Sequence, residues 1–214
     1  IEIGIPYSDS VVDGPTIQES NRVALENGMS LKLLFEQLAN MRKQVSIPVI
    51  LMGSLNPMMQ YDMENFCKKC QEVGVDGIIV PDLLMQQYLD EYKELFDQYD
   101  LRNTFLISPQ TSEKRIREID EYSDGFIYMV SSHSITGAKS GITDEQIGYF
   151  TTVREMDLKS PRLIGFGISD YDSFTKASSF SHGAIIGSAF IKVLQTAENL
   201  TEDIKSYIKG IKQV

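Results

Sequence analysis

The chain has 214 residues, which is enough for one large domain or two small ones with a substantial core. Its hydrophobic fraction of 42% and charged fraction of 23% exclude a disordered or fibrous chain. The formal net charge of −10, without a basic stripe along the sequence, argues against nucleic acid as a partner.

Membrane and secretory signals are missing from the sequence. The longest apolar runs, such as AIIGSAFIKVL (184–194), are broken by Gly, Ser and Lys and fall short of the roughly 20 residues that a membrane helix needs. No charged and then apolar leader opens the chain. We therefore expect a cytoplasmic protein. Because Ile1 already lies in a predicted strand, we also expect that the natural N-terminus precedes it.

Seven short apolar runs of strand type alternate with segments of helical periodicity. The spacing is that of one βα unit each time, except for a wider first gap that leaves room for an extra helix. Strict alternation of strands and helices indicates a parallel sheet. The runs, in chain order, are residues 1–6, 48–53, 76–82, 103–108, 125–130, 162–167 and 183–189.

Helix start and stop signals lie between these runs. Four side chains of the N-capping type precede helical segments, and two glycines follow them where helices should end. The expected N-caps are Ser30, Asp62, Ser112 and Thr201, and the expected stops are Gly28 and Gly74.

Two parallel architectures fit this alternation, an open doubly wound sheet and a closed (βα)8 barrel. The first strand is not followed by G-x-G-x-x-G, the usual mark of a dinucleotide-binding sheet. The glycine-rich turns GFGIS (165–169) and GSAF (187–190) follow the last two runs, where barrels keep a phosphate site after strands 7 and 8. The expected fold class is therefore an α/β (βα)8 TIM barrel, a single domain over residues 1–214 that lacks the first strand.

The same two turns predict a phosphorylated ligand. Backbone N–H groups that glycine leaves uncovered, next to a helix N-terminus, bind an anion without Lys or Arg. The alternative is that these glycines only make tight turns at helix starts. Their occurrence on consecutive βα turns favours the phosphate site.

Two carboxylates form a candidate acid and base pair. In a closed barrel Glu2 and Gly4 point to the interior, because Ile1, Ile3 and Ile5 occupy the other face of the strand. Burial would raise the pKa of Glu2, and Gly4 would leave room for a ligand. Asp13 follows in the loop, on the face where barrel enzymes keep their chemistry. Alternatively, Asp13 only caps the helix that Pro15 begins.

Cys67 and Cys70 form a CxxC motif inside an amphipathic helix of about residues 62–73. A redox pair normally lies at a helix start, and a zinc site needs more ligands than these two cysteines and the distant His133 and His182 provide. We therefore expect two reduced cysteines and no metal site.

The stretch IEIGIPYSDSVVDGPTIQ (1–18) resembles the signature of the tryptophan synthase alpha subunit family, whose usual form is close to I-E-L-G-I-P-F-S-D-P-x-A-D-G-P-x-I-Q. The likeness spans essentially the whole chain in the family's order. It continues through LMGSLNP (51–57), GVDGIIVPDL (74–83), FLISPQTS (105–112), YMVSSHSITGAKSG (128–141), GFGIS (165–169) and GSAFIK (187–192).

This resemblance implies an eight-stranded barrel whose first strand and N-terminal helix precede Ile1. It also implies that the barrel cleaves indole-3-glycerol phosphate to indole and glyceraldehyde 3-phosphate, a reverse aldol reaction without a cofactor. By motif match Glu2 takes the place of the catalytic acid, Asp13 that of the carboxylate facing the indole N–H, and Tyr128 that of a nearby tyrosine. Ile17 matches the indole end of the pocket, and Thr136 matches a mobile loop. The positions that match the surroundings of the phosphate are Gly137, Phe166, Gly167, Gly187 and Ser188.

The resemblance also implies a partner, the beta subunit of an α2β2 complex, which carries pyridoxal phosphate. Asp9, Asn56 and Pro57 fall where the alpha subunit usually meets it, although a solvated loop would look the same in sequence. Two alternatives stay open. A stand-alone indole-releasing lyase would bind no beta subunit, and an inert barrel acting as an activating partner would bind phosphate without turnover.

Several residues depart from the family pattern. Ser10 replaces the usual Pro, Ser54 replaces a common aromatic residue, and Leu84 stands where Pro is frequent. Ser132 and Ser134 replace Arg and Gly in the mobile loop. These changes concern the partner surface and loop closure more than the acid pair.

Overall fold

The computed structural model describes residues 1–10, 13–131, 142–165 and 167–213. The chain divides into two compact units. Unit 1 comprises Ile1–Ser10, Gln18–Phe105 and Ser123–Gly125, and unit 2 comprises Val11–Ile17, Leu106–Tyr122 and Phe126–Val214. The single domain over residues 1–214 stays a prediction.

Parallel strands form the centre of unit 1. β1 (Glu2–Gly4), β2 (Ile50–Met52), β3 (Gly77–Ile79) and β4 (Arg102–Ile107) follow one another in chain order. In the common register Ile3 lies beside Leu51, Ile78 and then Asn103, so these side chains share one face. That face is closed, because Leu51 and Ile78 are fully buried.

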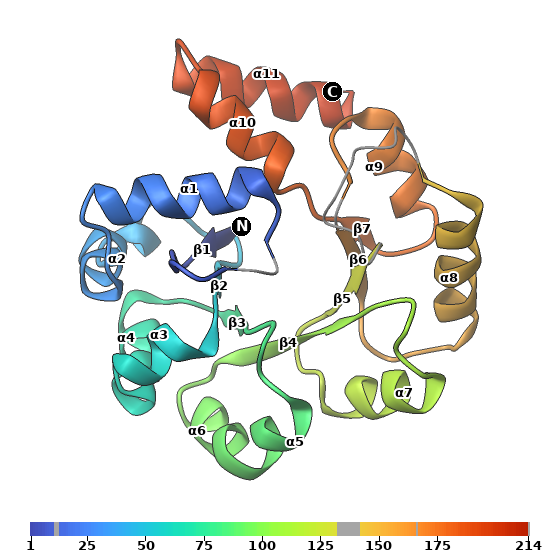
Figure 1. Cartoon of the computed structure of the whole chain (residues 1–214), viewed down its shortest axis with the longest axis horizontal. Coiled ribbons are helices and arrows are strands. Elements are labelled where there is room, and N and C mark those ends of the chain that lie inside the picture. Colours follow the sequence, from blue (N-terminus) through green and yellow to red (C-terminus); the bar gives the residue numbers. More distant parts are fainter. Residues whose placement is uncertain (11–12, 132–141, 166, 214) are drawn as a thin grey trace. The chain divides into compact units, whose positions relative to one another are not determined.

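The helices after these strands follow the predicted alternation (Figure 1). The wide first gap holds two helices, as expected. The helical elements are α1 (Pro15–Glu26), whose first residues belong to unit 2, α2 (Leu31–Leu38), η1 (Met41–Lys43), α3 (Leu55–Gln60), α4 (Met63–Val73), α5 (Met85–Gln87), η2 (Tyr88–Tyr92) and α6 (Lys93–Gln98).

Unit 2 contains three further parallel strands, β5 (Ile127–Val130), β6 (Arg162–Gly165) and β7 (Gly183–Ala184). The prediction of a strand over residues 183–189 is wrong beyond Ala184. The chain leaves the ladder after Ile185, whose N–H donates to the carbonyl of Ile164 at 2.8 Å, and a helix begins at Ser188.

The helices of unit 2 are α7 (Glu113–Tyr122), α8 (Asp144–Glu155), α9 (Tyr171–Ser178), α10 (Ser188–Thr196) and α11 (Leu200–Lys212). α9 packs against β6 and β7, and α11 packs against both α9 and α10 (Figure 1). α10 begins at Ser188, shortly after β7 ends at Ala184.

Most of the predicted capping signals are confirmed. The side chains of Ser30, Asp62 and Ser112 accept hydrogen bonds from backbone N–H groups three residues later. Gly74 ends α4 in the left-handed conformation at φ 82°. Gly28, at φ 81°, lies two residues after the last residue of α1.

The expected cap Thr201 is wrong. α11 begins two residues earlier than expected, at Leu200 instead of Glu202, because the Asn199 side chain accepts a hydrogen bond from the Glu202 N–H at 3.3 Å. Asn caps helices more readily than Thr, so the upstream residue takes the position.

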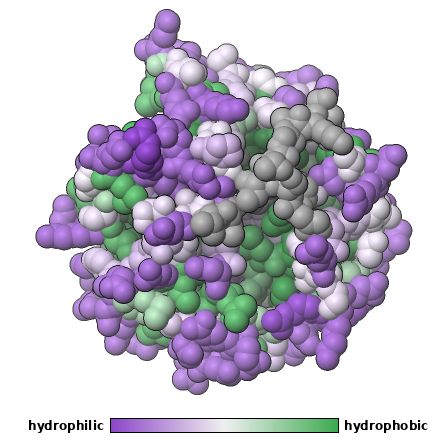
Figure 2. All heavy atoms as spheres, in the orientation of Figure 1, coloured by the Kyte–Doolittle hydropathy of each residue, from purple (hydrophilic) through white to green (hydrophobic). Residues whose placement is uncertain are grey.

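Charged side chains cover the outer face of α1. Arg22 bridges Glu19 and Glu26 at 2.6 Å each, and all three side chains are more than half exposed. Figure 2 shows this region as strongly hydrophilic. None of the helices in the described part of the chain combines the length and the apolarity that crossing a membrane requires.

Candidate active site

Glu2 is the first residue of β1 and lies beside Ile50 of β2. The structure differs from the expectation of burial, because the Glu2 side chain is exposed. Within unit 1 its neighbour on the same face is Gly4, which has no side chain, and a Cβ at Gly4 would meet no atom within 4 Å. The open space predicted beside Glu2 is therefore present.

Asp13 precedes α1 and Ile17 lies in its first turn, and both residues belong to unit 2. Both residues are half-buried. Pro15 begins the helix as predicted, and the Ile17 N–H donates to the Gly14 carbonyl at 3.0 Å, which closes the first turn.

Tyr128 is buried in the middle of β5 and leans over Gly165, the last residue of β6. Gly165 pairs with Val130, which lies on the same face as Tyr128 two residues on. A Cβ at Gly165 would overlap the hydroxyl oxygen of Tyr128 and would lie 2.5 Å from its Cζ. The absence of a side chain at Gly165 therefore leaves the space that the phenol of Tyr128 occupies.

The two glycine turns follow neighbouring strands. β6 pairs with β7, so Gly167 and Gly187 lie in segments that leave the same end of the unit 2 ladder. Both glycines are exposed, and a Cβ on either would meet no atom within 4 Å. Gly167 has φ 77°, a conformation that L side chains rarely adopt.

The second turn opens a helix that suits an anion. Gly187 is the N-cap of α10 and supplies no capping side chain, and the first turn contains no acidic residue. Ser188, the first helical residue, is exposed. The unpaired N–H groups and the positive end of the helix dipole therefore face no competing side-chain carboxylate in that turn.

Three predicted site residues lie outside the described residues. They are Thr136, Gly137 and Phe166, and the loop departures Ser132 and Ser134 lie there too.

The residues predicted for the partner surface gather in unit 1. Asp9 and Asn56 are exposed and Pro57 is half-buried. Asn56 belongs to α3, and its Nδ2 donates to the Tyr7 hydroxyl oxygen at 3.1 Å. This bond brings the segment after β2 to the loop after β1 that carries Asp9.

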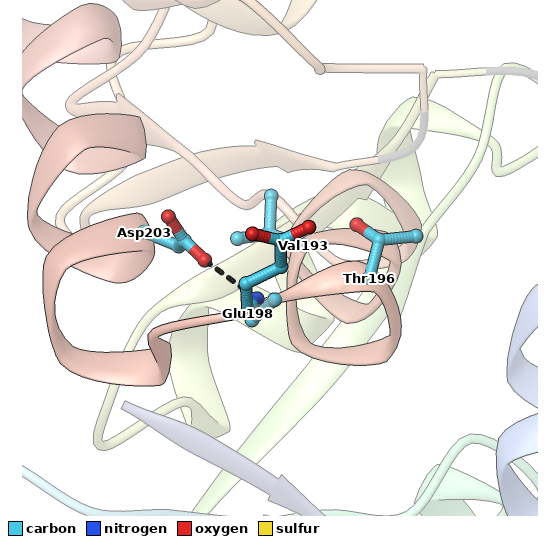
Figure 3. A pocket seen from close by; sticks show the side chains of 5 residues that line it. Val193, Thr196, Glu198 and Asp203 are labelled. Atoms are coloured by element: carbon cyan, nitrogen blue, oxygen red, sulfur yellow. Dashed lines mark hydrogen bonds between the residues drawn. The ribbon is translucent and has the colours of Figure 1, made fainter.

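A separate hollow of about 350 Å³ lies between α10 and α11 (Figure 3). Asp203 lies in its wall and accepts hydrogen bonds from the N–H groups of Glu198 and Asn199. The side chains around it carry two carboxylates and no cation, so it does not suit phosphate. Among the described residues, no three His, Cys, Asp or Glu side chains form a group that could hold a metal ion.

Cys67 and Cys70 are fully buried in α4 and are not joined to each other. Burial raises the pKa of the Cys67 thiol to about 12 and raises the pKa of the Cys70 thiol as well. Thiols of this kind are inert core residues, which agrees with the expectation of two reduced cysteines.

Comparison with known proteins decides the family. A family model described as the tryptophan synthase alpha chain matches residues 1–213. The tryptophan synthase alpha chain of Flavobacterium psychrophilum is 56% identical over 211 residues, which cover 99% of this chain and 83% of that protein. The chain belongs to the tryptophan synthase alpha chain family. The protein of that name from Christiangramia forsetii is 54% identical over 212 residues, 99% of this chain and 82% of the relative.

Solved structures of the family share the fold. The tryptophan synthase A-subunit of Pyrococcus furiosus matches with a TM-score of 0.90 and 30% identity, over 100% of this chain and 86% of that one. A chain of the tryptophan synthase complex from the same organism matches with a TM-score of 0.88. The (βα)8 class predicted from the sequence is thereby confirmed.

The family assigns the reaction. Its members cleave indole-3-glycerol phosphate to indole and glyceraldehyde 3-phosphate in tryptophan biosynthesis, and this chain is a lyase of that kind. In this family pyridoxal phosphate belongs to the beta subunit, with which the alpha chain is partnered.

Gly165 is a site residue that the sequence motifs do not single out. In sequence it belongs to the glycine-rich stretch GFGIS (165–169), whereas the structure places it under the Tyr128 ring. A glycine inside an apolar strand run, as in RLIGFG (162–167), indicates a close approach of another group and was the available signal.

Proposed function

We propose that Glu2 and Asp13 are the acid and base pair that cleaves indole-3-glycerol phosphate in this chain, with Tyr128 beside the reacting atoms. Glu2 suits the role of proton shuttle because it lies on a strand next to the open space over Gly4. Asp13 suits the role of facing the indole N–H because it directly precedes α1, whose first turn holds the half-buried Ile17 that would line the indole ring.

The reaction needs two proton movements. Glu2 adds a proton to C3 of the indole, which leaves a positive charge on the ring nitrogen that the Asp13 carboxylate stabilises. The Glu2 carboxylate, which has given up its proton, then takes the proton of the adjacent hydroxyl of the glycerol phosphate, and that carbon becomes the aldehyde. The electrons of the broken carbon–carbon bond return to the ring and restore neutral indole.

The phosphate would be held by main-chain N–H groups at Gly167, Gly187 and Ser188. The observation that carries this assignment is that both glycine turns leave the same end of two paired strands. The space over both glycines is open, so an anion can approach the backbone closely.

The partner would be the beta subunit in an α2β2 complex. Asp9, Asn56 and Pro57 are accessible enough to meet it, and Leu84, 69% exposed, and Met59, 53% exposed, add apolar surface in the same unit.

The test is indole release from indole-3-glycerol phosphate by the wild type, Glu2→Gln and Asp13→Asn. Each substitution keeps the shape of the side chain and removes its charge, so we expect kcat to fall by about two orders of magnitude or more. Wild-type rates in both variants would overturn the assignment of the pair.

A matched control is Glu36→Gln. Glu36 is an exposed carboxylate on α2, away from the loops that follow the strands, and the substitution is expected to leave the rate unchanged. Equal losses in all three variants would point to a general effect of charge removal instead of acid and base catalysis.

A further inference from the structure

The segment of residues 7–10, within the loop after β1, is tied at both ends by hydroxyl groups. Near its start, the Tyr7 hydroxyl oxygen accepts the hydrogen bond from Asn56 Nδ2 at 3.1 Å. At its end, Ser10 Oγ accepts from Asn21 Nδ2 at 3.0 Å, and the Ser10 carbonyl accepts from Gln18 Nε2 at 3.3 Å. All of these residues belong to unit 1.

Asn56, which donates to the Tyr7 hydroxyl, is itself held in place. Ser54, the N-cap of α3, makes no side-chain capping bond. Instead, Asp82 of the segment after β3 accepts a hydrogen bond from the Leu55 N–H at 2.9 Å. The Asp82 carboxylate therefore fixes the start of α3, and Asn56 in that turn fixes Tyr7.

The two ends of the segment of residues 7–10 differ in burial from its middle. Ser10 is only 8% exposed and Tyr7 is half-buried, whereas Ser8 and Asp9 between them are exposed. The Ser8 hydroxyl donates to Asp9 Oδ2 at 2.8 Å. The ties thus present one carboxylate on a short segment whose two ends are fixed.

We propose that Tyr7 and Ser10 are positioning residues that hold Asp9 in the conformation in which the beta subunit binds it. The inference rests on the proposed partner surface and adds the device that prepares it. A loop that is fixed before binding loses less conformational freedom when the complex forms, so its affinity is higher than that of a loose loop. Both ties come from hydroxyl groups, and the Ser10 hydroxyl stands where the family usually has Pro, which offers none.

The experiment measures the affinity of the full chain for the beta subunit of the same organism by calorimetric titration. Tyr7→Phe and Ser10→Ala remove only the hydroxyl groups. Each is expected to weaken the affinity about 2-fold to 10-fold, the effect of one hydrogen bond. Tyr99→Phe is the matched control, because its hydroxyl ties to Glu64 at 3.4 Å in the same unit and away from the loop. It should bind like the wild type.

A double-mutant cycle separates positioning from general stability. If Tyr7 acts through Asp9, then Tyr7→Phe should change the affinity little once Asp9→Asn is present. Three outcomes would each overturn the proposal. The losses of binding free energy in Tyr7→Phe and Asp9→Asn could add up fully in the double variant, or Tyr7→Phe and Ser10→Ala could bind with wild-type affinity. The third is that the chain does not bind the beta subunit at all. Indole release by the unmodified chain alone reports on the proposed acid pair separately, and its failure with the affinity pattern intact would count only against that pair.

Discussion

Tyr128 of β5 and Gly165 of β6 are in such close contact that a side chain at position 165 would occupy the place of the phenol hydroxyl. Both residues lie in one parallel pair of strands, and their relation follows from the register of Val130 with Gly165. The position of a predicted active-site side chain thus depends on a residue that carries no functional group.

Gly165→Ala is expected to lower indole release by about tenfold or more, because the added methyl group displaces the Tyr128 ring and small displacements in a catalytic site are costly. Overpacking should also lower the free energy of unfolding by about 1 to 3 kcal/mol. Steady-state kinetics and urea unfolding check both. Gly148→Ala, in the open middle of α8, is the control and should leave activity unchanged. Wild-type activity in Gly165→Ala would show that the ring position does not matter.

Asp120 makes the stability of unit 2 depend on pH in the acid range. Burial raises the pKa of Asp120, but hydrogen bonds from the N–H groups of Lys159 at 2.9 Å and Ser160 at 2.8 Å outweigh this effect, so its pKa is lowered from 3.8. A carboxyl group with a lowered folded-state pKa stabilises the protein above the unfolded value. That contribution is lost as the pH falls from about 4 through the folded pKa.

Asp120→Asn is therefore expected to cost about 1 kcal/mol at pH 7, because an amide cannot accept both bonds through two oxygens. The difference from the wild type should shrink as the pH falls from about 4 through the folded pKa, because the wild-type carboxylate becomes protonated over that range. Urea unfolding midpoints of the two proteins across this pH range measure the difference in stability. Asp100→Asn, at an exposed position with φ 55° that Asn tolerates, should change neither the midpoint nor its pH dependence. A constant difference at every pH would refute the role of the charge.

Cys67 and Cys70 should resist thiol reagents in the folded protein. Only the thiolate reacts, and burial raises both thiol pKa values well above neutral pH. Ellman's reagent at pH 8 should titrate neither thiol without denaturant and both in unfolding urea. Rapid modification of the native protein would show that α4 opens locally.

The sequence was most informative where structure is local. The caps at Ser30 and Asp62 were predictable because each side chain bonds a backbone group only three residues away. The prediction of Thr201 as a cap was wrong because Asn199, two residues upstream, is the stronger capping residue and takes the position. The predicted end of the last strand was wrong because an apolar run does not reveal where the hydrogen-bonded ladder stops.

Side-chain environment was harder to predict because it depends on neighbouring strands. The glycine turns at Gly167 and Gly187 were matched by motif, and their nearness follows from the pairing of β6 with β7. The contact between Tyr128 and Gly165 required the register of two strands that are far apart in sequence. The exposure of Glu2 depends on what covers β1, which alternation along one strand does not specify.

Gly167 offers a sharp test of the phosphate cradle because the chain contains a matched glycine. Gly167 and Gly28 have φ values of 77° and 81°, and a Cβ on either would meet no atom within 4 Å. Substitution by Ala therefore imposes the same backbone strain at both sites, about 1 to 2 kcal/mol, without a clash. Gly28 lies after α1, away from both glycine turns in the sequence.

Gly167→Ala and Gly28→Ala are expected to lose similar stability in urea unfolding, whereas only Gly167→Ala should raise KM for indole-3-glycerol phosphate. The added methyl group would stand over the backbone N–H groups proposed to bind the phosphate, so we expect about a tenfold increase, the effect of weakening one or two charge-assisted hydrogen bonds. Inorganic phosphate should likewise inhibit Gly167→Ala more weakly than the wild type. Equal KM values in the two variants would show that the turn after β6 does not contact the phosphate, since the strain common to both would then account for every change observed.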